Sequence, residues 1–151
     1  MDTATELYDY LKNEVKWEDG IRSRKGFTRK AKSVDTESKI FIELSGYLNI
    51  AYEGLTGSSL ESDYFVLGIY LNYYENGEMY TPNHSHPGTQ QLILSLGATR
   101  TLNVGKKSFN MSNGSAILFG SAVHGVKKEK VNDGRISIAT FMVPRNTLLR
   151  F

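Results

Sequence analysis

Cysteine is absent from this sequence, and histidine is scarce, with three residues in 151. The absence of cysteine excludes disulfides, thiolate metal sites and a cysteine nucleophile, and it fits a reducing compartment. No apolar run is long enough to cross a bilayer, and no charged-then-apolar leader begins the chain. We therefore expect a cytoplasmic protein without membrane contact, or an intracellular protein of a host cell if the chain is viral.

An excess of one charge is also lacking, because 18 lysines and arginines face 16 acidic residues. This balance favours an anionic partner only weakly. The hydrophobic content of 40% is that of an ordinary globular protein. The length predicts one domain over residues 1–151, in which a helical and basic part, residues 1–63, supports a β core, residues 64–143.

Two helices are predicted in the first part. The first begins with the capping-box spacing of Thr3 and Glu6. The second covers residues 36–53, where apolar side chains return every three or four positions and Thr36 is the candidate N-cap. Residues 55–63 are rich in glycine, serine and threonine, and this composition predicts a loop.

From residue 64 the apolar period changes to two, which is typical of β-strands. Turn sequences such as Asn113-Gly114 separate the runs. The predicted strands are 64–74, 90–96, 99–104, 107–111, 115–119 and 135–143. Two helices followed by a run of short strands predict an α+β fold, with the two N-terminal helices packed against a small sandwich or barrel.

All three histidines lie in the β core. His84 and His86 are two positions apart, so they would share one face of a strand, and His124 follows much later. Two imidazoles on one face and a third from a distant strand can form a metal site. Each histidine alone would more often be incidental, but the full set in this arrangement predicts a metal centre.

Two polar pairs flank the histidines in the sequence. Asn72 and Tyr74 share a face of one predicted strand, and Arg135 and Ser137 share a face of another. Arginine beside serine can bind a carboxylate, and asparagine and tyrosine can donate to the oxygens of a keto acid. Polar filling of a barrel wall would also explain Asn72 and Ser137, whereas a buried Arg135 would require an anion.

These residues follow the order of a known set of motifs. The sequence resembles the AlkB-like branch of the Fe(II)/2-oxoglutarate-dependent dioxygenases, whose motifs are Asn-x-Tyr, His-x-Asp, Ser-Leu-Gly-x-x-Arg, His and Arg-x-Ser or Asn. The elements that match are Asn72-Tyr73-Tyr74, His84-Ser85-His86, Ser95-Leu96-Gly97-Ala98-Thr99-Arg100, His124-Gly125-Val126 and Arg135-Ile136-Ser137-Ile138. The matching region, residues 72–141, is about half of the chain.

The resemblance implies a double-stranded β-helix (jelly-roll) core in which the three histidines hold Fe(II). It implies 2-oxoglutarate as cosubstrate, with Arg135 on the distal carboxylate and with contacts from Asn72, Tyr74 and Ser137. The implied reaction is hydroxylation or oxidative demethylation. A nucleic acid base, a protein side chain or a small metabolite would be the substrate.

Two positions depart from this pattern. His86 stands where the family has a carboxylate ligand, and Phe141 stands where it has a second arginine. Three neutral imidazoles leave the charge of a divalent ion uncompensated, so the site could prefer another ion or have lost turnover. The loss of the second arginine would weaken the grip on the cosubstrate.

The His-x-His pair also resembles the first cupin motif. Gly77, the two histidines and Gly97 approximate this motif, with Gln90 in the place of the usual glutamate. His124 after Gly120 approximates the second motif. Cupins share the jelly-roll architecture, so both resemblances predict the same fold. The alternatives to the oxygenase are therefore a cupin-like protein with a three-histidine metal site and a non-catalytic jelly-roll binding module.

A basic segment precedes the β core, with seven lysines and arginines between residues 16 and 32. Beside a barrel mouth it would attract a polyanion such as single-stranded nucleic acid. A solvated edge strand that deters aggregation would explain the same composition. On the first hypothesis, the expected substrate contacts are Arg22, Arg24, Arg29, Lys30 and Arg100.

Overall fold

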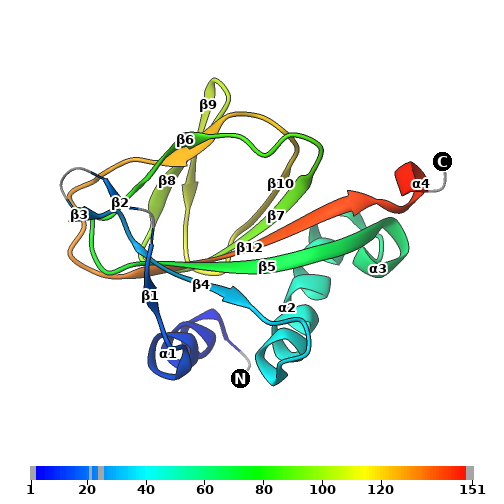
Figure 1. The fold of residues 1–151 in the computed structure, drawn as a ribbon, viewed down its shortest axis with the longest axis horizontal. Coiled ribbons are helices and arrows are strands. Elements are labelled where there is room, and N and C mark those ends of the chain that lie inside the picture. Colours follow the sequence, from blue (N-terminus) through cyan, green and yellow to red (C-terminus); the bar gives the residue numbers. More distant parts are fainter. Residues whose placement is uncertain (1–2, 21, 24–25, 149–151) are drawn as a thin grey trace.

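Two antiparallel β-sheets face each other, and two long helices lie outside the larger one (Figure 1). The computed structural model describes residues 3–20, 22–23 and 26–148. Within these ranges no helix has the length and apolar character needed to cross a membrane. The arrangement confirms the predicted α+β jelly-roll with helices packed against it.

The strands form one large sheet, one small sheet and a separate ribbon. In the large sheet the order is β1 (Glu18–Asp19), β4 (Lys30–Val34), β5 (Tyr64–Tyr74), β12 (Arg135–Pro144), β7 (Gln90–Gly97) and β10 (Ala116–Phe119). In the small sheet it is β6 (Thr81–His84), β11 (His124–Val126), β8 (Arg100–Val104) and β9 (Lys107–Met111). The ribbon pairs β2 (Arg22–Ser23) with β3 (Gly26–Phe27).

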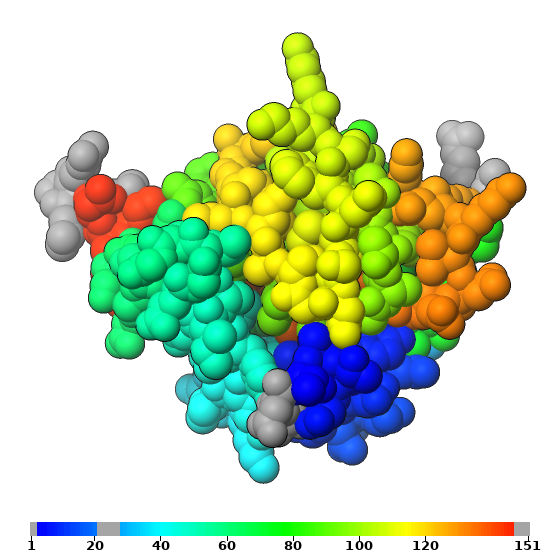
Figure 2. All heavy atoms as spheres, turned by 180° about the vertical axis from the view of Figure 1, so that it is seen from behind, coloured from blue at the N-terminus to red at the C-terminus, as the bar shows by residue number. Residues whose placement is uncertain are grey.

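Helix α1 (Ala4–Glu14) begins where the sequence predicts. The Thr3 hydroxyl accepts a hydrogen bond from the Glu6 amide at 3.1 Å and so caps the first turn. Asn113 donates to the Thr5 hydroxyl at 3.1 Å, which fixes the helix against the turn before β10. In the view from behind, the blue N-terminal helix lies against the yellow segment (Figure 2).

Helix α2 (Lys39–Thr56) starts and ends three residues later than predicted. Ser38, not Thr36, is the N-cap, and its hydroxyl accepts from the Phe41 amide at 3.2 Å. The helix continues through Gly54 and stops at Gly57, whose positive φ of 74° ends it. A short helix, α3 (Leu60–Asp63), occupies part of the predicted loop, and α4 (Arg145–Leu148) follows β12.

The large sheet has one apolar face and one face that carries polar residues. Leu71 and Ile138 point to the helices, where they join Leu7, Leu11 and other apolar side chains in the main core. Because successive side chains alternate between faces, the neighbours of these residues point between the two sheets. The functional candidates of β5 and β12 therefore all face the interior of the jelly-roll.

Candidate metal centre and its cavity

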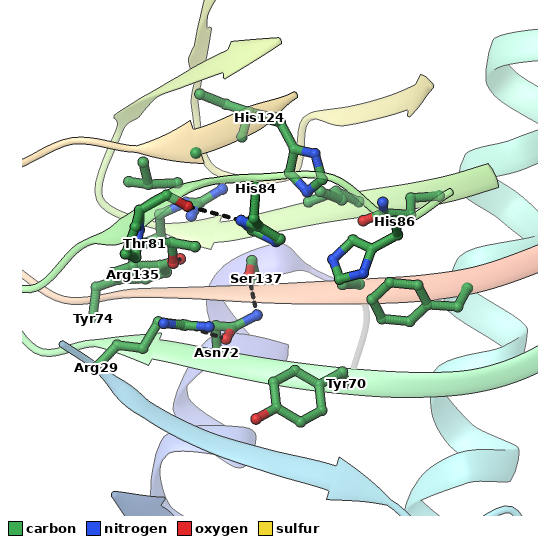
Figure 3. Close-up of a pocket in the computed structure, with 18 residues that line it drawn as sticks. Arg29, Tyr70, Asn72, Tyr74, Thr81, His84, His86, His124, Arg135 and Ser137 are labelled. Atoms are coloured by element: carbon green, nitrogen blue, oxygen red, sulfur yellow. Dashed lines mark hydrogen bonds between the residues drawn. The ribbon is translucent and has the colours of Figure 1, made fainter. Parts of the chain in front are cut away.

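A cavity of about 350 Å³ lies between the two sheets. The large sheet contributes Asn72, Tyr74, Arg135 and Ser137 to its wall, and the three histidines stand opposite (Figure 3). The residues expected to bind metal and those expected to bind the cosubstrate thus line one cavity.

The three histidines converge. His84 at the end of β6 is paired in register with His124 on β11, and their ring centroids are 4.3 Å apart. His86 lies beyond the end of β6, so the expected shared strand face is wrong, but the loop brings its ring centroid within 4.7 Å of that of His84. One ligand nitrogen from each ring lies within 4.8 Å of the others, which suits a single metal ion.

Gly125 allows β11 to lie close to β6. A Cβ at this position would lie 2.8 Å from the Thr81 carbonyl oxygen and would collide with the Asn83 side chain. Since His124 precedes this glycine directly, the close approach of the two strands sets the distance between His84 and His124. Close packing of β11 against β6 therefore requires glycine at position 125, directly after His124.

Backbone carbonyls orient two of the rings. His84 Nδ1 lies 2.8 Å from the Pro82 oxygen, and His124 Nδ1 lies 3.0 Å from the Ala122 oxygen. A carbonyl only accepts, so Nδ1 carries the proton and Nε2 has the lone pair for a metal. Burial lowers the pKa of His124, and burial together with the charge of His84 lowers the pKa of His86. Both shifts favour the neutral, metal-binding form.

Arg135 is buried, with 1% of its surface exposed. Its Nε donates to Ser95 Oγ at 2.8 Å, and its Cζ lies 5.3 Å from the centre of the Tyr74 ring. Among the described residues Nη1 has no hydrogen-bond partner, and burial lowers the pKa of the guanidinium. A buried guanidinium without a carboxylate is costly, so this position is suited to an anionic ligand.

Arg135 and Ser137 line the same cavity, as expected, but Ser95 and not Ser137 contacts the guanidinium. Ser137 instead accepts from Asn72 Nδ2 at 3.4 Å. Ser95 lies opposite Ser137 in the sheet register and begins the Ser-Leu-Gly element, so the motif itself contained this signal. The Tyr74 hydroxyl shares a hydrogen bond of 2.6 Å with Thr81 Oγ1, which fixes the ring beneath the guanidinium.

Comparison with known proteins places the fold. No family model matches this sequence, and no curated protein is significantly similar to it. Three solved structures share its architecture. SnoN, a non-heme alpha-ketoglutarate-dependent epimerase from nogalamycin biosynthesis, has a TM-score of 0.67 at 13% identity, over 93% of this chain and 70% of its own.

The other two resemble the chain over nearly their whole length. A predicted oxalate decarboxylase from Thermotoga maritima has a TM-score of 0.57 at 12% identity, over 86% of this chain and 94% of its own. KdgF from a Halomonas species has a TM-score of 0.54 at 13% identity, over 91% and 96%. The fold is a cupin-type double-stranded β-helix. None of these three proteins is described as AlkB-like.

The sequence suggested Gln90 for the glutamate position of the cupin pattern, but in the structure its neighbour Gln91 faces the cavity. The Gln90 side chain points away from the cavity and accepts from the Tyr64 hydroxyl. Gln91, which is 1% exposed, lines the cavity, and its Nε2 has no partner among the described residues. Strand β7 runs from Gln90 to Gly97, and its alternation decides which of the two neighbouring glutamines faces inward.

Arg100 does not line the cavity, contrary to the expected substrate contact. It is 1% exposed and donates to the carbonyl oxygens of Asn76, Met79 and Lys127 at 2.8–3.2 Å. Its Nε lies 3.5 Å from a carboxylate oxygen of Glu129. These contacts use the guanidinium to join three loops, so Arg100 is a structural residue.

The basic segment does not form one cationic strand. It is divided among β1 to β4, where Lys30 lies 3.4 Å from a Glu75 carboxylate oxygen and Lys32 lies 2.8 Å from one of Glu18. Arg22 belongs to β2, and Arg24 lies outside the described residues. The basic segment is therefore not a single edge strand.

Arg29 departs most from the expectation of an exposed charge. It is 5% exposed and lines the cavity. Its Nε donates to Asn72 Oδ1 at 2.7 Å, and Nη1 donates to Thr28 Oγ1 at 2.9 Å. Periodicity could not reveal this position, because Arg29 lies in the short connection before β4.

Proposed function

We propose that the protein is a metal-dependent oxygenase with 2-oxoglutarate as cosubstrate. The proposal rests on one observation: a single cavity contains three converging imidazoles and the buried, carboxylate-free guanidinium of Arg135. The imidazoles fit a divalent metal ion, and the guanidinium fits an organic acid. The order of the motifs supports the AlkB-like branch, and the alpha-ketoglutarate dependence of SnoN supports the same cosubstrate.

The donor set fits Fe(II). His84, His86 and His124 would hold the ion through three neutral nitrogens, and a chelating ligand would complete its coordination. The carbonyls of Pro82 and Ala122 fix the rings of His84 and His124, and such contacts raise the metal affinity of a ligand. With dioxygen as the oxidant, Fe(II) and 2-oxoglutarate would supply the chemistry that inserts one oxygen atom into a C–H bond, while 2-oxoglutarate takes the other and is converted to succinate and carbon dioxide.

The residues of the chain would bind and orient the cosubstrate. Arg135 would pair with the distal carboxylate of the cosubstrate, while Ser95 and the Tyr74 ring hold the guanidinium in place. Asn72 and Ser137 would donate to the remaining oxygens from the next row of the sheet. The two sheets flank these groups on either side of the cavity.

A cupin-like metal protein that does not use 2-oxoglutarate is the second candidate. His86 in place of a carboxylate ligand and the inward-facing Gln91 favour it. This candidate gives no role to the buried Arg135. Binding of 2-oxoglutarate through Arg135 therefore distinguishes the two candidates.

The experiment combines metal analysis with calorimetry. Protein purified without a histidine tag should contain a first-row metal, and His124→Ala should lose most of it. Under nitrogen and with Fe(II), Arg135→Leu should weaken 2-oxoglutarate binding by about 2–4 kcal/mol, because a charge-assisted contact in a desolvated site is lost. Arg145→Leu is the matched control, since Arg145 does not line the cavity. Unchanged affinity in Arg135→Leu would favour the cupin-like candidate, and succinate formation would show turnover.

A further inference from the structure

The cavity contains two buried cations and no counterion. Arg29 and Arg135 both line it, with 5% and 1% of their surfaces exposed, and the described lining residues include neither aspartate nor glutamate. No salt bridge in the described part of the chain involves either arginine. Two buried charges of one sign are costly without anions, so the occupant of the cavity should carry two acidic groups.

The two guanidinium groups are held on the same sheet face. Arg29 binds Asn72 and Arg135 binds Ser95, and both of these partners are opposite Ser137 in the register. Asn72 and Ser95 belong to the strands on either side of β12, so the two guanidinium groups flank the row of Ser137. A short organic diacid can lie across this row, with one carboxylate at each guanidinium.

Asn72 fixes the orientation of the second guanidinium. Its Oδ1 accepts from Arg29 Nε at 2.7 Å, and its Nδ2 donates to Ser137 Oγ at 3.4 Å. The second bond of Arg29 runs from Nη1 to Thr28. None of the described hydrogen bonds uses Nη2, and Figure 3 shows the guanidinium beside Asn72 at the cavity wall. The group is therefore held in place by two contacts while it retains donors for a ligand.

We propose that Arg29 is a cosubstrate-binding residue: it binds the carboxylate of 2-oxoglutarate next to the keto group, while Arg135 binds the distal one. This inference rests on the proposed function, because it takes 2-oxoglutarate as the occupant. It gives one residue of the basic segment a role inside the cavity. It also makes the cavity selective for dianions, since a ligand with one carboxylate leaves one guanidinium unpaired.

The test compares two ligands by calorimetry under nitrogen with Fe(II): 2-oxoglutarate and 2-oxobutanoate, which lacks the distal carboxylate. Arg29→Met should weaken the binding of both by about tenfold or more, because both carry the carboxylate next to the keto group. Arg135→Met should weaken the binding of 2-oxoglutarate only. Arg145→Met, outside the cavity, should change neither.

The outcomes separate this inference from the proposed function. If Arg29→Met binds both ligands normally, or loses only the binding of 2-oxoglutarate, the proposed role of Arg29 is overturned. A selective effect of Arg135→Met on 2-oxoglutarate would still support the proposed function. If wild-type protein binds neither ligand, the function fails as well. Arg29→Lys is the second variant in case Arg29→Met does not fold. It keeps the charge but loses the Nε contact, so an equal and smaller weakening of both ligands supports the role, and normal binding of both overturns it.

Discussion

The ring of His86 lies edge-on against the ring of Phe141, with centroids 4.9 Å apart. These two residues stand where the AlkB-like pattern has a carboxylate ligand and a second arginine. The two departures from the pattern are therefore in contact with each other. A neutral imidazole beside a phenyl ring needs no counterion, whereas a carboxylate there would depend on the metal ion as its cation.

Restoring the carboxylate tests the role of this position. We expect His86→Asp to retain the metal, because an anionic ligand compensates the ion's charge, and to change the rate of 2-oxoglutarate turnover. His86→Ala should lose most of the metal. Metal content after dialysis and succinate formation measure the two effects. Equal metal loss in both variants would show that the site requires three nitrogens.

The sequence was sufficient for most of the fold because its signals are local. The alternation over Tyr64–Tyr74 predicts β5 with the bounds that the structure has, and the cap at Thr3 starts α1. The predicted bounds of α2 are wrong because Thr36 and Ser38 are equally good capping residues. The turn that follows Asp35 selects Ser38. The strands β6 and β11 are too short to show a period.

The site was less predictable because it depends on contacts between distant segments. Residue order identified the three histidines and Arg135, but the partner of Arg135, Ser95, follows from strand register. Arg29 enters the cavity through a connection that has no periodicity, and composition alone indicated an exposed charge. Arg100 occupies a position of the Ser-Leu-Gly-x-x-Arg motif, but in the structure it holds loops together. Its acceptors are backbone oxygens, and no sequence pattern reveals such partners.

The spacing of the two sheet-borne histidines depends on Gly125. Gly125→Ala places a methyl group against the Thr81 carbonyl and should push β11 away from β6. We expect the metal affinity to fall by about tenfold, because supporting contacts affect ligand geometry on this scale. Gly120→Ala is the matched control, since a Cβ there meets nothing within 4 Å. Competition with a fluorescent chelator measures the affinity, and an unchanged value would contradict the role of the close approach.

The metal-free protein should lose stability in acid. Burial lowers the pKa of His124 below its ordinary value of 6.5, so the unfolded chain binds a proton at a higher pH than the folded one. The free energy of unfolding should therefore be insensitive to this group above pH 6.5 and fall below it, by at most about 1.4 kcal/mol per pH unit. Urea titrations on both sides of this pH measure the slope. His124→Asn should show a shallower slope, and an equal slope would exclude His124 as its source.

Arg100 should matter for stability and not for ligand binding. Arg100→Met leaves three part-buried carbonyl oxygens without their donor and Glu129 without its cation. We expect a loss of about 3–5 kcal/mol in the free energy of unfolding. The same change at Arg145 should cost about 0.5 kcal/mol or less. A stable Arg100→Met protein that binds nucleic acid poorly would instead support the substrate contact expected from the sequence.

Single-stranded nucleic acid is the substrate proposal with the most direct test. Phosphate contacts from four basic side chains would give a log–log salt dependence of roughly −3 to −4. Lys30 and Lys32 already lie beside Glu75 and Glu18, so we expect a slope no steeper than about −2. Fluorescence titration of a labelled oligonucleotide at two salt concentrations measures it.

A pair of double variants completes the comparison. Replacing Lys30 and Lys32 by glutamine should weaken oligonucleotide binding if the basic segment carries it. The same changes at Lys106, in the turn before β9, and at Lys107, the first residue of β9, should not. Binding with a slope of −3 or steeper, lost only in the first variant, would establish a polyanion site beside the jelly-roll. No binding at low salt, where non-specific attraction is strongest, would exclude nucleic acid. The cavity of about 350 Å³ would then point to a small substrate or a single protein side chain.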